Sequence, residues 1–215
     1  MVTKDDVARV GAELAAFLLA ASCAGCGEPG ALLCGRCRRA VTADPQAGTT
    51  PRGMAFRAAL PFEGVTARCI RRLKGEGDTF LARPLGAALG EVLLPAMTPM
   101  TWVVPVPTAR AAFRRRGYRV PELLLRRAGV EPQRVLTRAA ETTEQKRLGA
   151  AAREENVRGA MRARRSGRGA ETLIVDDVVT TGATLDEAAR ALEEAGFRVV
   201  GAVALAATPR REGFG

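Results

Sequence analysis

Two carboxylates stand next to each other in this chain, between a short apolar run and a loop of small residues. Asp176 and Asp177 follow Thr172–Val175 and precede a stretch rich in hydroxyl groups, made of Thr180, Thr181, Gly182, Ala183 and Thr184. Ionised carboxylates only accept hydrogen bonds, so the vicinal hydroxyls of a ribose are suitable donors to them. A divalent cation would lower the repulsion between the two acids. The pair therefore favours the binding of a sugar.

The elements around the acids are predicted to hold them at one edge of a sheet. Thr172–Val175 is mostly apolar and β-branched, which is typical of a buried parallel strand. Thr184 and Glu187 match a capping box, Gly196 suits the position just past a helix end, and Arg198–Ala206 has the composition of a second strand. Between them, apolar residues recur at helical spacing: Leu185, Ala188, Ala189 and Leu192. In such β-loop-α-β units, ligands bind at the carboxyl ends of the strands.

The loop after the acids has the features of a phosphate site. The first N–H groups of a helix have no partner within the helix, and its N-terminus is partly positive. Gly182 lets the backbone approach an anion closely, and the threonines add hydroxyl donors. A strand ending in two acids also opens receiver domains, but these need on the order of a hundred further residues. Only 38 residues follow Asp177, which excludes a receiver.

The stretch Thr172–Thr184 resembles the phosphoribosyl-diphosphate (PRPP) signature of type I phosphoribosyltransferases. The resemblance implies that Asp176 and Asp177 hold the ribose hydroxyls during catalysis and that Mg²⁺ accompanies PRPP. It implies an α/β fold, with a parallel sheet flanked by helices. The PRPP-binding loop implied by the match consists of Val178, Val179, Thr180, Thr181, Gly182, Ala183 and Thr184.

Four cysteines near the N-terminus have the spacing of a metal site. Cys23, Cys26, Cys34 and Cys37 form C-x2-C-x7-C-x2-C, and four thiolates at paired close spacing suit tetrahedral zinc. Two disulfides would need an oxidising compartment, whereas the chain shows no export signal and we expect a cytoplasmic protein. An iron–sulfur cluster is a further alternative. Because four cysteines close the shell, the Zn²⁺ is predicted to be structural, and Cys69 is predicted to be a core residue.

Length and composition predict one main domain with a small appendage. Of the 215 residues, we assign 1–50 to an N-terminal helix and zinc finger and 51–215 to a phosphoribosyltransferase-like domain. The first part carries too little apolar sequence for a core, and a metal would replace that core. Residues 4–20 are expected to form an amphipathic helix and residues 45–53 a polar linker. No run of 18 apolar residues is present, which argues against a membrane span.

The chain is strongly basic, with a formal net charge of +10 and clusters such as Arg114–Arg116 and Arg162–Arg168. Such charge favours an anionic partner, either a diphosphate substrate or nucleic acid. Aromatic residues make up only 4% of the chain, which argues against a stacking platform for single strands. The alternative is that the positive charge reflects a general arginine-rich composition and was not selected for binding an anion.

The middle of the chain predicts further sheet and helix elements. Met54–Phe62 and Thr101–Val106 are expected strands, and Val65–Lys74 is an expected helix ending at Gly75. Leucines recur every four residues, which predicts a helix with one apolar face toward the core: Leu81, Leu85, Leu89 and Leu93. In phosphoribosyltransferases the loop after the second of these strands binds pyrophosphate, so the resemblance assigns the diphosphate to Thr108 and Arg110. Lys146, with Arg138, is expected to close on it from a hood.

Two longer strings, Val104–Leu124 and Thr137–Met161, resemble the ComF family when taken with Leu73–Gly75 and the four-cysteine finger. These phosphoribosyltransferase-like proteins are associated with DNA uptake in naturally competent bacteria. The residues that fall on the family's motifs are Arg114, Arg116, Gly117, Tyr118, Arg138, Thr142, Gln145, Leu148, Arg153 and Asn156. Arg119 and Val120 stand where the family usually has Asn-Gln.

The ComF resemblance implies a role in natural transformation. The reaction would transfer phosphoribosyl to a nitrogen acceptor with release of pyrophosphate. Implied partners are single-stranded DNA and competence proteins, namely the DNA-processing protein and the uptake helicase. A non-catalytic module that senses PRPP or binds protein or single-stranded DNA is the alternative. A salvage enzyme with no link to DNA would not need the finger.

Overall fold

The computed structural model describes residues 21–139 and 159–209, and its centre is a five-stranded sheet in the order β1-β2-β7-β6-β3. Strands β2, β7, β6 and β3 are parallel, and β1 is an antiparallel edge. The strands are β1 Gln46–Thr49, β2 Ala55–Pro61, β3 Trp102–Pro105, β4 Leu136–Arg138, β5 Met161–Ala163, β6 Glu171–Val179 and β7 Arg198–Ala207. The last two strands predicted from the sequence, β6 and β7, are neighbours in this sheet.

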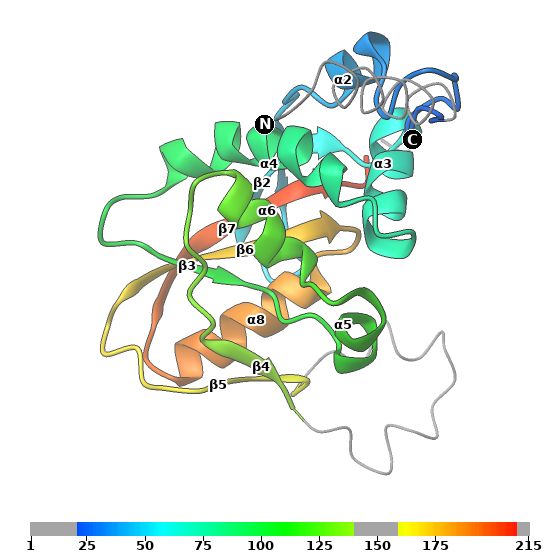
Figure 1. Cartoon of the computed structure of the whole chain (residues 1–215). Helices are drawn as coiled ribbons and strands as arrows, with labels where there is room; N and C mark the ends of the chain where they lie inside the picture. Colours follow the sequence, from blue (N-terminus) through cyan, green and yellow to red (C-terminus); the bar gives the residue numbers. More distant parts are fainter. Residues whose placement is uncertain (1–20, 140–158, 210–215) are drawn as a thin grey trace, which may run out of the picture.

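Helices cover both faces of the sheet (Figure 1). The helices are α2 Gly35–Ala40, α3 Gly64–Gly75, α4 Ala82–Leu93, α5 Arg110–Arg116, α6 Val120–Arg127 and α8 Ala183–Glu194, with short 3-10 turns at Thr79–Leu81 and Leu94–Ala96. One core cluster lies between the sheet and α3, α4 and α6, and the other lies between the sheet, α8 and the β4–β5 hairpin. The predicted leucine stripe is fully buried. The predicted α/β architecture is therefore confirmed.

Strand β6 is longer than the sequence predicted and includes both acids. The apolar run was expected to end the strand at Val175, but pairing with β7 continues to Val179. On its other side β6 pairs with β3, and that ladder stops where Pro105 faces Val175. Beyond this point one edge of β6 has no neighbouring strand in the sheet. Asp176 and Asp177 are the first two residues past it.

The predicted linker at residues 45–53 is wrong, because Gln46–Thr49 forms β1. The chain then turns sharply: the Thr50 N–H donates to the Met54 carbonyl at 2.9 Å, and the Met54 N–H donates to Thr50 Oγ1 at 3.1 Å. The finger is also not detached from the main fold, since Cys23 and Cys37 belong to the same core cluster as Ile70. The domain boundary that the sequence predicts after residue 50 falls in the turn between β1 and β2.

The predicted capping box at the start of α8 is also wrong. The helix begins at Ala183, and Gly182 is its N-cap with a φ of 87°. Thr184 therefore lies inside the first turn, and the Glu187 carboxylate points to β5 instead, where it accepts from the Met161 N–H at 2.8 Å and from Arg190. Burial opposes ionisation of Glu187, but hydrogen bonds from Arg190 and from the N–H groups of Met161 and Gly159 outweigh it and lower the pKa. The carboxylate fastens the β4–β5 hairpin to α8.

Some expected features lie outside the described residues: the helix over 4–20, Lys146, and the motif residues Thr142, Gln145, Leu148, Arg153 and Asn156. Gly196 follows the end of α8 with a φ of 81°, as predicted. Cys69 is fully buried, also as predicted. Across residues 21–139 and 159–209, the helices are all too short or too polar to cross a membrane.

Two glycines of α4 provide a matched test of how closely α4 and α6 pack. A Cβ at Gly86 would lie 2.4 Å from Arg127 Cβ and 3.0 Å from the Leu124 carbonyl oxygen, whereas one at Gly90 would lie 3.6 Å from Ala128 Cβ. We expect Gly86→Ala to lower the free energy of unfolding by about 1–3 kcal/mol through overpacking. Gly90→Ala should raise it by about 0.5–1 kcal/mol. Urea unfolding of both variants measures this, and equal effects would contradict the close helix contact.

Candidate functional site

One of the two acids of β6, Asp177, pairs with a lysine from a helix that is distant in the sequence. Asp176 is 8% exposed, and its Oδ1 accepts the Asp177 backbone N–H at 2.8 Å. Asp177 Oδ1 lies 2.6 Å from Lys74 Nζ, at the end of α3. In the sequence, Lys74 stood out only as part of a motif and was assigned no role. The structure thus adds one cation to the predicted acid pair.

The end of α3 is held in place by the last residue of α5 and by a residue just after it. The Tyr118 hydroxyl donates to the Leu73 carbonyl, and Arg116 Nη1 donates to the Lys74 carbonyl at 3.2 Å. The last carbonyls of a helix lack partners within the helix, so these two donors satisfy them. Two motifs that lie far apart in the sequence, Leu73–Gly75 and Arg116–Tyr118, therefore meet and fix where Lys74 can reach.

Burial raises the pKa of Asp176 to about 8, and the negative charge of Asp177 acts in the same direction. The Asp177 N–H and the Lys74 ammonium group lower the pKa by less. The free protein thus carries a proton on this acid at neutral pH, because two adjacent buried carboxylates are costly to ionise together. Hydroxyl donors or a cation placed against the pair would favour the ionised form.

The predicted phosphate loop connects β6 to α8. Thr180 and Thr181 are exposed, and Gly182 has a left-handed backbone conformation. A Cβ at Gly182 would lie 3.1 Å from Thr50 Cα in the β1–β2 turn, so both this close contact and the left-handed backbone favour glycine there. The same turn is fixed to α8, since the Arg52 N–H donates to Asp186 Oδ2 at 3.0 Å. The turn thus contacts both the loop and the first turn of α8, and the start of a helix is a general binding place for an anion.

The other predicted loop residues differ in placement. Val179 is buried in the core cluster on the α8 side, and Val178 packs against the cluster on the opposite face of the sheet. The Val179 side chain is therefore structural, and only its backbone could contact a ligand, whereas Val178 is only partly buried. Ala183 and Thr184 form the first turn of α8, where the Ala183 N–H lies 3.4 Å from Thr181 Oγ1.

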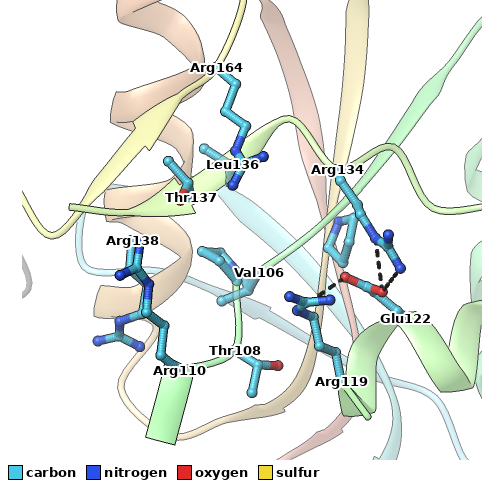
Figure 2. Close-up of a pocket in the computed structure, with 12 residues that line it drawn as sticks. Val106, Thr108, Arg110, Arg119, Glu122, Arg134, Leu136, Thr137, Arg138 and Arg164 are labelled. Atoms are coloured by element: carbon cyan, nitrogen blue, oxygen red, sulfur yellow. Dashed lines mark hydrogen bonds and ion pairs between the residues drawn. The ribbon is translucent and has the colours of Figure 1, made fainter. Parts of the chain in front are cut away.

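A pocket rich in arginine lies at the edge of the sheet beyond β3 (Figure 2). Thr108 and Arg110, predicted to bind diphosphate, line it together with Arg138 of β4. Lys146 lies outside the described residues. Sequence reasoning missed three further lining residues, Glu122, Arg134 and Arg164. No local signal marks Glu122 or Arg134, because single charged residues are not distinctive in a chain with 33 Lys and Arg residues. Arg164 belongs to the basic cluster Arg162–Arg168, which gave no specific role to any one arginine.

The four predicted metal ligands converge at the other end of α3. The Sγ atoms of Cys23, Cys26, Cys34 and Cys37 all lie within 4.8 Å of one another, and none is in a disulfide. The Cys26 and Cys34 sulfurs are 3.8 Å apart. Two sulfurs at about 2.3 Å from a tetrahedral zinc ion would also be about 3.8 Å apart. The cluster could hold a metal ion of zinc's size.

The electrostatics of these thiols favour a cation. Burial raises the pKa of Cys23, but N–H groups of Cys34, Cys26 and Gly25 outweigh it and bring the pKa to about 6. Burial and the three neighbouring thiols raise the pKa of Cys37 instead. Four negative sulfurs cannot coexist this closely without a positive charge between them. A divalent cation would supply that charge and allow all four to act as ligands.

The raised pKa of Asp176 makes stability depend on pH. Above about pH 4 the unfolded chain loses a proton that the folded protein keeps, so stability falls as the pH rises from about 4 to about 8. Asp176→Asn removes this loss and should raise the unfolding midpoint most at high pH. Thermal unfolding at about pH 5, 7 and 9 measures the difference, with exposed Asp44→Asn as the control. A gain that is constant across pH would contradict the raised pKa.

Removal of one cysteine tests the metal cluster. The wild-type protein should contain about one zinc per chain by mass spectrometry, and Cys37→Ser should lose it. Cys69→Ser is the matched control: this thiol is also buried, but burial raises its pKa to about 11 and it lies outside the cluster. Iron with visible absorption in place of zinc would support the iron–sulfur alternative.

The chain matches the family model described as "Phosphoribosyl transferase domain" over residues 106–214. Among solved structures, it is similar to Leishmania donovani UMP synthase, with 16% identity, a TM-score of 0.37, and coverage of 79% of this chain but only 30% of that one. It is also similar to TT1426 from Thermus thermophilus, with 20% identity, a TM-score of 0.33, and coverage of 62% of this chain and 85% of that one. No curated protein matches the chain. Because the family model spans half of the chain, this protein belongs to the phosphoribosyl transferase domain family, with the type I phosphoribosyltransferase-like architecture.

Proposed function

We propose that this protein binds PRPP and transfers its phosphoribosyl group to a nitrogen acceptor, with release of pyrophosphate. The observation that carries the proposal is the acid pair on β6, followed directly by the exposed residues Thr180 and Thr181 and the N-terminus of α8. Asp176 and Asp177 would accept hydrogen bonds from the two ribose hydroxyls, and Thr180–Thr184 would hold the 5′-phosphate. The family match to residues 106–214 covers these residues.

The reaction breaks the bond between the anomeric carbon and the diphosphate oxygen, which leaves with the electron pair. The acceptor nitrogen forms the new bond and gives up a proton. Positive charge develops on the ribose ring during this exchange, and the two carboxylates stabilise it. Catalysis of this kind rests on positioning and electrostatics rather than on a covalent nucleophile.

The diphosphate would lie against Thr108 and Arg110, in the segment that follows the strand next to the acids. The guanidinium group of Arg110 offers paired donors that suit phosphate oxygens. Mg²⁺, when bound with PRPP, would neutralise part of the diphosphate charge, and the carboxylate oxygens of Asp176 and Asp177 are of the ligand type it prefers. Lys74 balances Asp177 in the free protein and is positioned to remain beside the ligand.

We also propose that the metal of the four-cysteine cluster is zinc and that it is structural. Four protein ligands leave no open position for chemistry. Zinc held by thiolates suits a reducing compartment, which supports a cytoplasmic location. The finger and N-terminal segment, residues 1–50, would form one unit of the chain and residues 51–215 the other, with the two joined through a shared core.

The finer proposal is a ComF-like role in natural transformation. Its structural support is that two motifs of that family, Leu73–Gly75 and Arg116–Tyr118, contact each other and position Lys74 at the acids. DNA-processing and uptake-helicase proteins, and single-stranded DNA, would be the partners. Restoration of DNA uptake in a competent strain that lacks its own homologue tests this role, and failure to restore it would reject the role.

PRPP binding tests the central proposal. The wild-type protein should bind PRPP with Mg²⁺ in isothermal titration, and Asp177→Asn should weaken binding at least about tenfold, since one charged acceptor is lost. Exposed Asp44→Asn should bind as the wild type does. Unchanged affinity in Asp177→Asn would reject the assignment of the acid pair.

A pyrophosphate-release assay with a panel of bases separates the two forms of the proposal. Release that depends on an added base and is lost in Asp177→Asn identifies a transferase. Saturable PRPP binding without release for any base would favour the non-catalytic PRPP-sensing module.

A further inference from the structure

Helix α3 extends from the four-cysteine cluster to the acid pair. Val65, in its first turn, packs against the finger, and Lys74, in its last turn, has its Nζ 2.6 Å from Asp177 Oδ1. Between these two residues the helix rises roughly 14 Å, at 1.5 Å per residue. A single rigid element thus contacts both of the sites described above.

The finger contacts α3 through the turn Cys23–Cys26. Arg68 of α3 donates through Nε to the Gly25 carbonyl. A Cβ at Gly25 would lie 2.8 Å from Val65 Cγ1 and 2.6 Å from Cys37 Sγ, so the backbone here packs against both α3 and a cysteine of the cluster. Two of the four cysteines begin and end this turn. A metal ion that holds them would therefore also hold the contact with α3.

Two cysteines of the cluster also cover the buried face of α3. Cys23 and Cys37 are 1% and 0% exposed, and they belong to the same core cluster as Ile70 and Leu73 of α3. In small metal-binding segments that lack a core of their own, the free energy of metal binding is what folds the segment. Loss of the metal would therefore remove part of the cover of α3.

The other end of α3 is held by residues outside the finger. The Tyr118 hydroxyl donates to the Leu73 carbonyl, and Arg116 Nη1 donates to the Lys74 carbonyl at 3.2 Å. Without the finger, α3 would be fixed at one end instead of two. A fixed Lys74 orients the Asp177 carboxylate as an acceptor for ribose hydroxyls and offsets the negative charge that PRPP brings. A less constrained helix would do both less well.

We propose that the four-cysteine cluster and the PRPP site are linked through α3, so that metal binding at the cluster strengthens PRPP binding at the acid pair. The proposal rests on the proposed PRPP site and assigns it a regulator, namely the metal content of the finger. With metal, α3 is fixed at both ends and Lys74 is held beside Asp177. Without metal, the end of α3 at Val65 is free. Such a link is reciprocal, so PRPP must strengthen metal binding by the same factor.

PRPP titrations of the wild-type protein with and without zinc test the link. PRPP binding with Mg²⁺ is measured under reducing conditions on zinc-loaded protein, on protein stripped by a zinc-selective chelator, and on stripped protein reloaded with zinc. The ratio of the affinities with and without zinc is the linkage factor. We expect a factor of about five or more, with full recovery on reloading. Equal affinities, or a loss that zinc does not restore, would overturn the proposal.

The reverse measurement starts from the zinc-loaded protein. Its zinc affinity is determined by competition with a chelator of known affinity, without PRPP and with PRPP at saturation, and should rise by the same linkage factor. Circular dichroism of the stripped protein should keep most of the helix and strand signal, because the sheet and its helices lie outside the finger. Complete unfolding without zinc would show that the metal supports the whole fold, and would overturn the proposal.

Lys74→Met separates a link through α3 from general stabilisation by a ligand. At PRPP concentrations that saturate the variant, its zinc affinity should be the same with and without PRPP, because the cation that α3 positions is gone. A ligand that merely stabilises the folded state would still protect the zinc in this variant. Persistence of the full linkage factor would therefore reject the role of Lys74 and overturn the proposal.

Arg68→Met tests the contact between α3 and the finger. The variant keeps the aliphatic stem but loses the donor to the Gly25 carbonyl, so the linkage factor should fall while about one zinc per chain remains bound. Arg71→Met on the same helix is the matched control, since the Arg71 guanidinium lies 5.6 Å from the centre of the Phe62 ring. Its factor should equal that of the wild type. Equal factors in the two variants would overturn the proposed route.

Three results separate this proposal from the proposed function. If the zinc-loaded wild-type protein does not bind PRPP, the PRPP site fails and the link fails with it. If PRPP binds equally well with and without zinc, the PRPP site stands and only the link fails. If the purified protein binds no zinc, the link fails whatever the affinity for PRPP.

Discussion

Two carboxylates on consecutive residues of a buried strand repel each other, and the surrounding structure is arranged around that repulsion. Asp177 is balanced by Lys74 at 2.6 Å, while burial keeps a proton on Asp176 at neutral pH. Tyr118 and Arg116 hold the end of α3, from which Lys74 reaches Asp177. The free protein therefore stores an electrostatic cost that a ligand with hydroxyl donors and a cation can relieve.

The strands of the sheet end at different levels, and this leaves one edge of β6 unpaired at the acids. Strand β3 stops opposite Val175, whereas β6 and β7 continue, so the acids lie beside a gap in the sheet rather than beneath a neighbouring strand. The arginine pocket is lined in part by Pro105 and Val106, where β3 ends. Negative groups thus lie on β6, and positive groups line a pocket that begins at the end of the adjacent strand β3. This separation of charge suits a substrate that has a sugar at one end and a diphosphate at the other.

Features encoded by local patterns could be predicted from the sequence. The leucine stripe of α4, the strands flanking α8, and the cysteine cage all follow from residue types at short spacing. Features that depend on partners far away in the sequence could not be predicted in this way. Strand β1 has no alternating apolar pattern and exists because it pairs with β2. The ion pair between Lys74 and Asp177 spans 103 positions, and Glu187 was misassigned because its partner, Met161, lies on another element. The arginine pocket was hidden by the abundance of arginine elsewhere.

The continuation of β6 through Val179 has a thermodynamic consequence. Fixing the backbone of a residue costs roughly 1–2 kcal/mol of conformational entropy. Because both acids lie on a strand hydrogen-bonded to β7, that ordering is completed when the chain folds and does not recur at each encounter with a ligand. Their geometry is preorganised, in the sense that a rigid scaffold presents them already aligned. Differences in affinity between ligands will then reflect the groups that the ligands carry rather than rearrangement of the backbone beneath them.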